Sequence, residues 1–146
     1  MNGYEYDYDL SLYSEKIDKV ISDHGIKIKY VNAESTDPSF SFPKHNTIIL
    51  NVAYESNISH LFILAHEIFH TIEKNVNQQI YAFSPLAKLE EEKNAHLFAL
   101  RLFFDTIEDN YVPNYIEVIY ALGLPLSMEH LVRQVWIEHS SRDFVI

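Results

Sequence analysis

The sequence predicts an α+β protein in which an N-terminal helix and a small antiparallel sheet precede several further helices. Residues 26–52 contain alternating and β-branched apolar runs, which are typical of strands. On both sides of that region, apolar residues recur at three- and four-residue spacing, which is typical of helices. With 146 residues and only 3 glycines, we expect one folded domain over 1–146, with a loose polar arm at 1–9.

The first predicted helix is amphipathic and ends near Gly25. Glycine commonly follows a helix because it adopts the left-handed backbone conformation without strain. The apolar face of this helix is formed by five residues at helical spacing: Leu10, Tyr13, Ile17, Val20 and Ile21.

Three short strands are expected after Gly25. Residues 26–31 alternate apolar and charged side chains, residues 39–42 alternate again, and residues 47–52 are β-branched and apolar. Because the connections between them are short, we expect these strands to pair in antiparallel fashion.

Helices are expected over most of the remaining chain. The apolar run 58–72 predicts a helix capped by Ser56 or Asn57, with Leu61, Ala65, Ile68 and Ile72 as its core stripe. Ser84 and Pro85 predict the start of another long helix that ends near Ile107. A short helix over 114–122 should end near Gly123, and Ser127 should cap a last helix.

Composition excludes several classes of function. A formal net charge of −10 argues against direct nucleic-acid binding, which needs clustered Lys and Arg, and instead fits a basic protein partner. The absence of cysteine excludes disulfides and thiolate metal sites. No apolar run approaches the ~18 residues of a membrane span, and the N-terminus lacks a secretory signal, so we expect a cytoplasmic protein.

The motif His66-Glu67-Ile68-Phe69-His70 lies in the predicted helix 58–72. Residues four apart on a helix share a face, so His66 and His70 can direct their imidazoles at one ion. Glu67 is then placed to deprotonate a metal-bound water, as the catalytic base. This H-E-x-x-H pattern is the signature of zinc metallopeptidases. The alternative interpretation is a helix with two surface histidines.

A catalytic zinc site needs a third protein ligand, and Glu90-Glu91-Glu92 offers candidates. Glu92 shares its helix face with the small residues Ala95 and Ala99, which would allow a close approach to the motif helix. Glu91 shares its face with bulkier side chains, and Glu90 should face outward. Spacing therefore ranks Glu92 ahead of Glu91 without deciding between them, and a solvated charge run in a first helical turn is the alternative.

Residues 92–99, Glu-Lys-Asn-Ala-His-Leu-Phe-Ala, resemble the E-x-x-A-x-x-F-A element of ImmA/IrrE-type metallopeptidases. Residues 48–51 with 64–67, and residues 123–131, are also similar to that family, so the resemblance covers about residues 26–138. It implies a zincin-like minimal metallopeptidase fold with one Zn²⁺ per chain. It further implies that His66, His70 and Glu92 hold the ion, which decides for Glu92 over Glu91.

Three positions depart from the usual pattern of that family. Phe69 stands where many relatives have Gly, and His96 stands where they frequently have Asn or Asp. Residues 102–105, Leu-Phe-Phe-Asp, stand where a Met-Pro pair often follows. None of these differences touches the implied ligands. Phe69 bears on the shape of the cleft, and the three differences together bear on substrate preference.

Two further side chains are candidates for roles in the site. His96 lies one turn beyond Glu92 and is either a partner that orients a ligand, a transition-state donor, an alternative ligand, or a packing residue. Tyr81 could donate to an oxyanion, although packing is the simpler expectation. The remaining histidines are expected at the surface or with satisfied hydrogen bonds: His24, His45, His60, His130 and His139.

The leading functional hypothesis is a soluble zinc endopeptidase. The resemblance implies a limited cut in a DNA-binding transcriptional repressor of a bacterium or mobile element. A second hypothesis is a metal-binding interaction module that sequesters a regulator without cutting it. A third is a helical domain without a metal. The intact Glu67 favours the enzyme, because a purely structural metal site has no use for a general base.

Overall fold

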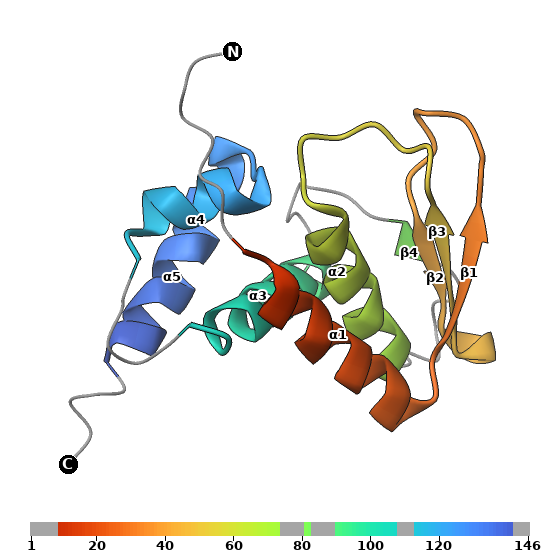
Figure 1. Ribbon diagram of the computed structural model, residues 1–146, viewed down its shortest axis with the longest axis horizontal. Helices are drawn as coiled ribbons and strands as arrows, with labels where there is room; N and C mark the ends of the chain where they lie inside the picture. Colours follow the sequence, from red (N-terminus) through yellow and green to blue (C-terminus); the bar gives the residue numbers. More distant parts are fainter. Residues whose placement is uncertain (1–8, 74–80, 83–89, 108–112, 142–146) are drawn as a thin grey trace.

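The structure is a computed structural model and describes residues 9–73, 81–82, 90–107 and 113–141, with the backbone alone at 81–82. This part of the chain confirms the predicted α+β class (Figure 1). Its helices and strands are α1 (Ser11–His24), β1 (Lys27–Val31), β2 (Phe40–Phe42), β3 (Thr47–Asn51), α2 (His60–Glu73), β4 (Tyr81–Ala82), α3 (Glu90–Phe104), α4 (Tyr115–Leu122) and α5 (Glu129–Ser140).

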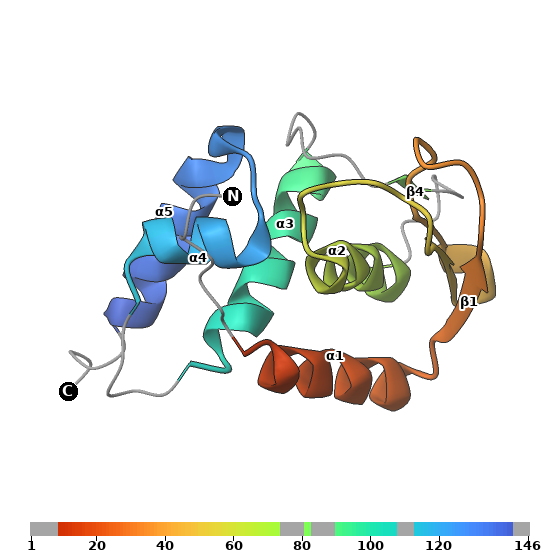
Figure 2. The same ribbon diagram turned by 45° about the horizontal axis from the view of Figure 1, so that its top comes forward.

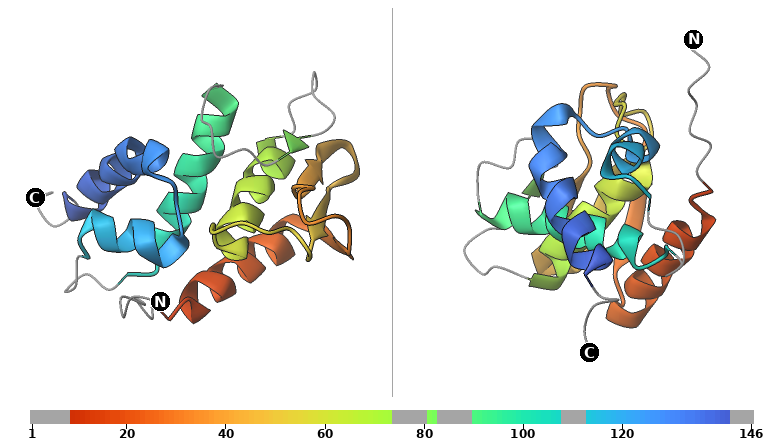
Figure 3. Two further views of the ribbon diagram at one scale, coloured as in Figure 1. Left: turned by 90° about the horizontal axis from the view of Figure 1, so that it is seen from above. Right: turned by 90° about the vertical axis from the view of Figure 1, so that its left-hand side faces the viewer.

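Helix α2 lies at the centre of the molecule. It packs against the sheet on one side and against α3 on the other, and α3 in turn packs against α5 (Figures 1 and 2). Viewed from above, α4 and α5 lie on one side of α3, and the sheet lies beyond α2 (Figure 3). Helix α1 contacts both α2 and α3. The order of layers is therefore sheet, α2, α3, and then the pair α4 and α5.

This central position explains a difference from the predicted packing of α2. The predicted core stripe is buried at Ala65 and Ile68, but Phe62, Ile63 and Leu64 on the other sides of α2 are buried as well. A helix that is covered on two sides needs more than one apolar face. The prediction of a single stripe was incomplete because it assumed that only one layer would cover α2.

The prediction of an antiparallel sheet was wrong for one strand pair. The sheet has the order β1-β3-β2-β4, and β1 pairs with β3 in parallel, whereas β2 is antiparallel to both β3 and β4. The chain reverses direction once between β1 and β2 and again between β2 and β3, so β3 regains the direction of β1. Short connections lead to antiparallel pairs only where consecutive strands are neighbours, and here β3 lies between β1 and β2.

Buried Asn51 fixes the long connection between β1 and β2. Its Oδ1 accepts hydrogen bonds from the backbone N–H groups of Ala33 and Ala53, each at 3.0 Å. Its Nδ2 donates to the carbonyl oxygens of Glu34, at 2.8 Å, and Asp37, at 2.7 Å. The amide is therefore fully used, and the loop is held against the end of β3, just before the chain enters α2.

Two predicted helix caps differ from the structure. Helix α2 begins at His60, and the Oγ of Ser59 accepts from the backbone N–H of Leu61 at 3.2 Å. Ser56, which was predicted as a cap, accepts from Ile58 before the helix begins, at 3.1 Å. Ser127 lies inside a 3₁₀ turn, Leu126–Met128, that has no side-chain cap. In both cases, a short turn that periodicity does not reveal precedes the helix.

Other predicted boundaries are confirmed or lie outside the described residues. Gly25 follows α1 and Gly123 follows α4, both with positive φ, and Asn114 caps α4 by accepting from the N–H of Ile116 at 2.9 Å. The predicted start of the long helix at Ser84 and Pro85, and the arm over 1–8, lie outside the described residues.

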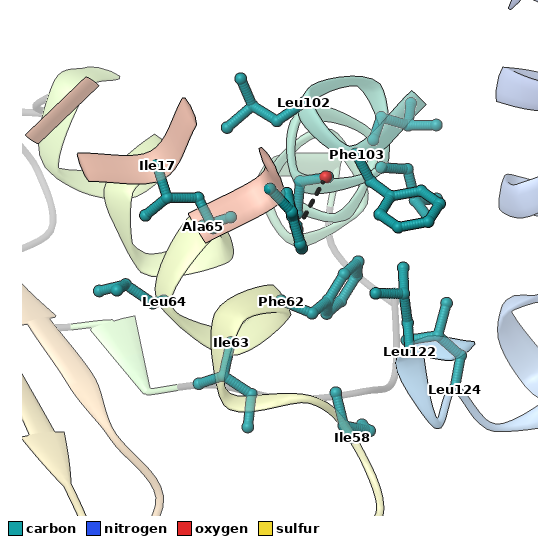
Figure 4. Close-up of a cluster of buried hydrophobic side chains, with 14 of the residues drawn as sticks. Ile17, Ile58, Phe62, Ile63, Leu64, Ala65, Leu102, Phe103, Leu122 and Leu124 are labelled. Carbon is teal, nitrogen blue, oxygen red and sulfur yellow. Dashed lines mark hydrogen bonds between the residues drawn. The ribbon is translucent and has the colours of Figure 1, made fainter. Parts of the chain in front are cut away.

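The main core surrounds α2 and joins all of the layers. Ile17 of α1, Phe62 of α2 and Phe103 of α3 meet there with Leu122 and Leu124 from the end of α4 (Figure 4). The backbone N–H of Ser59 donates to the carbonyl of Leu122 at 2.8 Å, which ties the start of α2 to the end of α4. Within the described ranges, none of the helices has the length and apolar composition that crossing a membrane requires.

Candidate metal centre

The close approach of α2 and α3 is built from small residues. Ala95 and Ala99 of α3 are fully buried, so the backbones of the two helices can lie close together. On the same face, Glu92 is buried, whereas Glu91 is half-buried and Glu90 is exposed. The ranking of the three glutamates by helical spacing therefore agrees with their burial.

Both histidines of the motif contact the carboxylate of Glu92. The Nε2 atom of His66 lies 3.0 Å from one oxygen of Glu92, and the Nε2 atom of His70 lies 2.8 Å from the other. The two imidazole rings lie nearly edge to face, with centroids 4.8 Å apart. The structure thus brings together the two histidines from α2 and the one acid from α3 that the sequence singles out.

Glu67 is fully buried beside the first histidine. Its Oε1 lies 3.2 Å from Nδ1 of His66, so one oxygen of the carboxylate accepts a hydrogen bond from that ring. Its Oε2 has no hydrogen-bond partner among the described residues. A carboxylate at this position orients the His66 ring, with Nε2 pointing toward Glu92, and retains one oxygen that can accept a proton.

The pKa values of His66 and Glu92 are set by burial and by hydrogen bonding together. Burial alone would lower the pKa of His66, but hydrogen bonds and charge from Glu67 and Glu92 raise it to about 9. Burial would likewise raise the pKa of Glu92, but hydrogen bonds and charge from His66 and His70 lower it to about 2. Hydrogen bonding and charge therefore favour a protonated His66 beside an ionised Glu92, and a metal ion would compete with that proton for the same groups.

His96 joins this cluster from the next turn of α3. It is fully buried, its ring centroid lies 4.6 Å from that of His66, and the ring centroid of Phe62 lies 5.9 Å away. Ligand atoms of His66, Glu92 and His96 all lie within 4.8 Å of one another. This buried group could hold a metal ion, and it includes His96, whose role the sequence left open. The predicted ligand His70 is not a member of this group of three, and it joins the cluster through its contact with Glu92 at 2.8 Å.

The other predicted residues lie away from this cluster or outside the described side chains. His24, His45, His60 and His130 are exposed, as expected. His139 is different, because it is buried in α5 against Phe104, and its Nδ1 has no hydrogen-bond partner among the described residues. The side chain of Tyr81 lies outside the described part of the structure.

Sequence reasoning missed the contact between Phe62 and His96. The two rings lie almost parallel, with an interplanar angle of 14°. Phe62 is four residues before His66 on α2, and His96 is four residues after Glu92 on α3. The pair thus continues the same interhelical face by one turn, and this spacing could have indicated it.

The donor set fits a divalent transition metal. Neutral imidazoles and one carboxylate are ligands that zinc takes in proteins, and no thiolate is present in this chain. The cluster is buried, polar and shared between two rigid helices, which is the kind of support that a metal site requires. Comparison with protein-family models, curated proteins and solved structures gives no match for the chain.

Proposed function

We propose that the protein is a zinc-dependent endopeptidase that makes a limited cut in a protein substrate. The observation that carries the proposal is the convergence of His66 and His70 on the carboxylate of Glu92, at 3.0 and 2.8 Å, with Glu67 beside them. Two imidazoles and a carboxylate are the protein ligands of one established class of catalytic zinc site. The zincin-like character of the fold is part of this proposal.

The residues divide into ligands and a base. His66, His70 and Glu92 would hold one Zn²⁺ per chain. When bound, zinc supplies Lewis acidity toward a peptide carbonyl and lowers the pKa of a water. The hydrogen bond from His66 Nδ1 to Glu67 supports this arrangement, because it leaves Nε2, which lies beside Glu92, as the nitrogen that would bind the ion.

Glu67 would transfer a proton from the attacking water to the departing amine. Its free oxygen accepts a proton from the attacking water and then donates it to the departing amine, so one carboxylate serves both halves of the reaction.

The substrate class comes from the sequence resemblance alone. It points to a DNA-binding transcriptional repressor in the same cytoplasm. The net charge of −10 supports a partner with a basic surface, because opposite charge speeds the encounter of two proteins. No direct contact of this chain with nucleic acid or with a membrane is part of the proposal.

The experiment is co-expression with repressors encoded beside the protein's own gene. The wild type should shorten one repressor, and mass spectrometry should locate a single cut. Glu67→Gln should retain zinc but lower the cleavage rate by about 100-fold or more, because the amide cannot accept the proton. Glu73→Gln, an exposed glutamate at the end of the same helix, is the matched control and should cut like the wild type.

Equal cleavage by the wild type and Glu67→Gln would remove Glu67 from the mechanism. If no repressor is cut while the zinc site is filled, the endopeptidase proposal fails for this substrate class.

A second candidate is a metal-held module that binds a regulator without cutting it. The observation that favours it is the enclosure of the centre: Glu67, His66 and His96 are all fully buried. A binding module would leave the repressor full length and co-purify with it, and the Glu67→Gln substitution would leave that binding unchanged.

A further inference from the structure

We propose that His96 is a fourth protein ligand of the same metal ion, so that the resting site is closed and must release His96 before it hydrolyses a peptide. This inference rests on the proposed function, since it concerns the regulation of that site. It can be tested by counting the imidazole ligands of the bound metal, without any measurement of cleavage.

The position of His96 favours coordination. The residue lies one helical turn after Glu92, on the face of α3 that contacts α2. Its ring is fully buried next to the ring of His66, with centroids 4.6 Å apart. The ligand atoms of His66, Glu92 and His96 lie within 4.8 Å of one another. Two ligands of a tetrahedral zinc ion are separated by roughly 3.3 Å, so a shift of at most about 1.5 Å would complete the contact.

Phe62 holds the His96 ring in this position. The two rings stack with a centroid distance of 5.9 Å and an angle of 14°, so one face of the imidazole is covered by an apolar surface. Such a contact restrains the ring without using its nitrogens. A ring restrained in this way has less freedom to lose when it binds an ion, which lowers the entropy that coordination costs.

A fourth ligand changes what the site does. Catalytic zinc sites keep one position for water, whereas sites with four protein ligands are closed. With His66, His70, Glu92 and His96 all bound, no position remains for water. The complete burial of Glu67 agrees with such a resting state, because the base is then shut off from solvent together with the metal. Release of His96 would open the position that the reaction needs.

The test counts imidazole ligands by X-ray absorption spectroscopy of the zinc-loaded wild-type protein. The expected result is three imidazoles and one carboxylate oxygen. In His96→Ala the count should fall to two imidazoles, and the Kd for zinc should rise by about 10-fold or more. His139→Ala is the matched control, because His139 is also a buried histidine packed on a phenylalanine ring, but on α5. It should keep three imidazoles and the wild-type Kd.

The same comparison with Co²⁺ in place of zinc gives a second readout. The wild type should show the strong visible absorption of a four-coordinate ion, and His96→Ala should show a spectrum changed by entry of solvent.

Three results would count against the role of His96, and one of them would also count against the proposed function. Two imidazoles in the wild type would overturn the role of His96 and leave the peptidase proposal standing. An unchanged zinc Kd and cobalt spectrum in His96→Ala would do the same. A wild-type protein that binds neither ion would overturn both proposals. Because the wild-type count is decisive alone, the test does not depend on whether His96→Ala folds.

Discussion

At the scale of single residues, the candidate site depends most on Glu92. Each oxygen of its carboxylate contacts a different histidine of α2, so this one side chain joins the two helices through polar groups. Helical spacing could rank Glu92 above Glu91, because the alanines on its face predict a close approach. Spacing could have indicated the contact between Phe62 and His96 but could not decide the role of His96, because the orientation of its ring depends on tertiary packing.

Substitution of Glu92 should therefore act on metal binding far more than substitution of its neighbour. We expect Glu92→Gln to raise the zinc Kd by about 100-fold or more, because a neutral amide is a poorer ligand than a carboxylate. Glu91→Gln is the matched control at a half-buried position of the same helical turn, and should bind zinc like the wild type. Calorimetric titration of both variants measures this. A similar loss in the two would mean that overall negative charge, rather than a ligand, sets the affinity.

At the scale of elements, two close contacts between segments distant in sequence position the helices that carry the site. The end of α4 meets the start of α2 at Gly123, where a Cβ atom would lie 1.7 Å from the carbonyl oxygen of Asn57. Helix α1 meets α3 through Tyr13, whose hydroxyl donates to the carbonyl oxygen of Ala99 at 3.0 Å. These contacts fix the helices that carry the site, and neither follows from periodicity, because each joins segments distant in sequence.

Gly123→Ala should destabilise the protein much more than Gly25→Ala. Both glycines have φ near +60°, so alanine at either position costs about 1–2 kcal/mol in backbone strain. At Gly25 the nearest atom to a new Cβ lies 4.0 Å away, whereas at Gly123 the backbone of Asn57 must move. We expect a total loss of about 3 kcal/mol or more for Gly123→Ala, measured by urea unfolding. Equal losses would mean that the contact between α4 and α2 is not close.

Tyr13 should make the stability depend on pH in the alkaline range. Burial raises the pKa of Tyr13 well above its usual value of 10.0. Above about pH 10 the unfolded chain loses this proton while the folded protein keeps it, so the free energy of unfolding falls as pH rises. The fall from this group is about 1.4 kcal/mol per pH unit.

Tyr13→Phe separates this effect from the hydrogen bond. Below pH 9 the variant should be about 1 kcal/mol less stable than the wild type, because the bond to Ala99 is lost. Above about pH 10 the difference should shrink and then reverse, because phenylalanine has no proton to lose. Urea unfolding from pH 7 to 11 checks this. Parallel curves for the two proteins over the whole range would contradict it.

At the scale of the whole molecule, local patterns predicted most of the elements but not how they are arranged. Periodicity indicated α1, α2, α4, α5 and the end of α3 within a few residues, because each helix has an apolar face to bury. The predicted start of the helix that contains α3 lies outside the described residues. It did not give the parallel pairing of β1 with β3, since strand order depends on which strand is inserted between two others. It also understated the burial of α2, which follows from being covered by both the sheet and α3.

The layered arrangement gives the site its support. Because α2 lies between the sheet and α3, its histidines are held on the side that faces Glu92, and the other layers keep that side from moving. A set of polar groups this deeply buried is costly unless every member has a partner. In the proposed site, His66, His70 and Glu92, which already contact one another, would share one metal ion as their common partner.

The central claim is that this interior cluster holds one zinc ion, and elemental analysis of the purified protein tests it most directly. The account predicts close to one zinc per chain, which a strong chelator removes and added zinc restores. Purified protein that contains no divalent metal, and that takes up none when zinc is supplied, would contradict it.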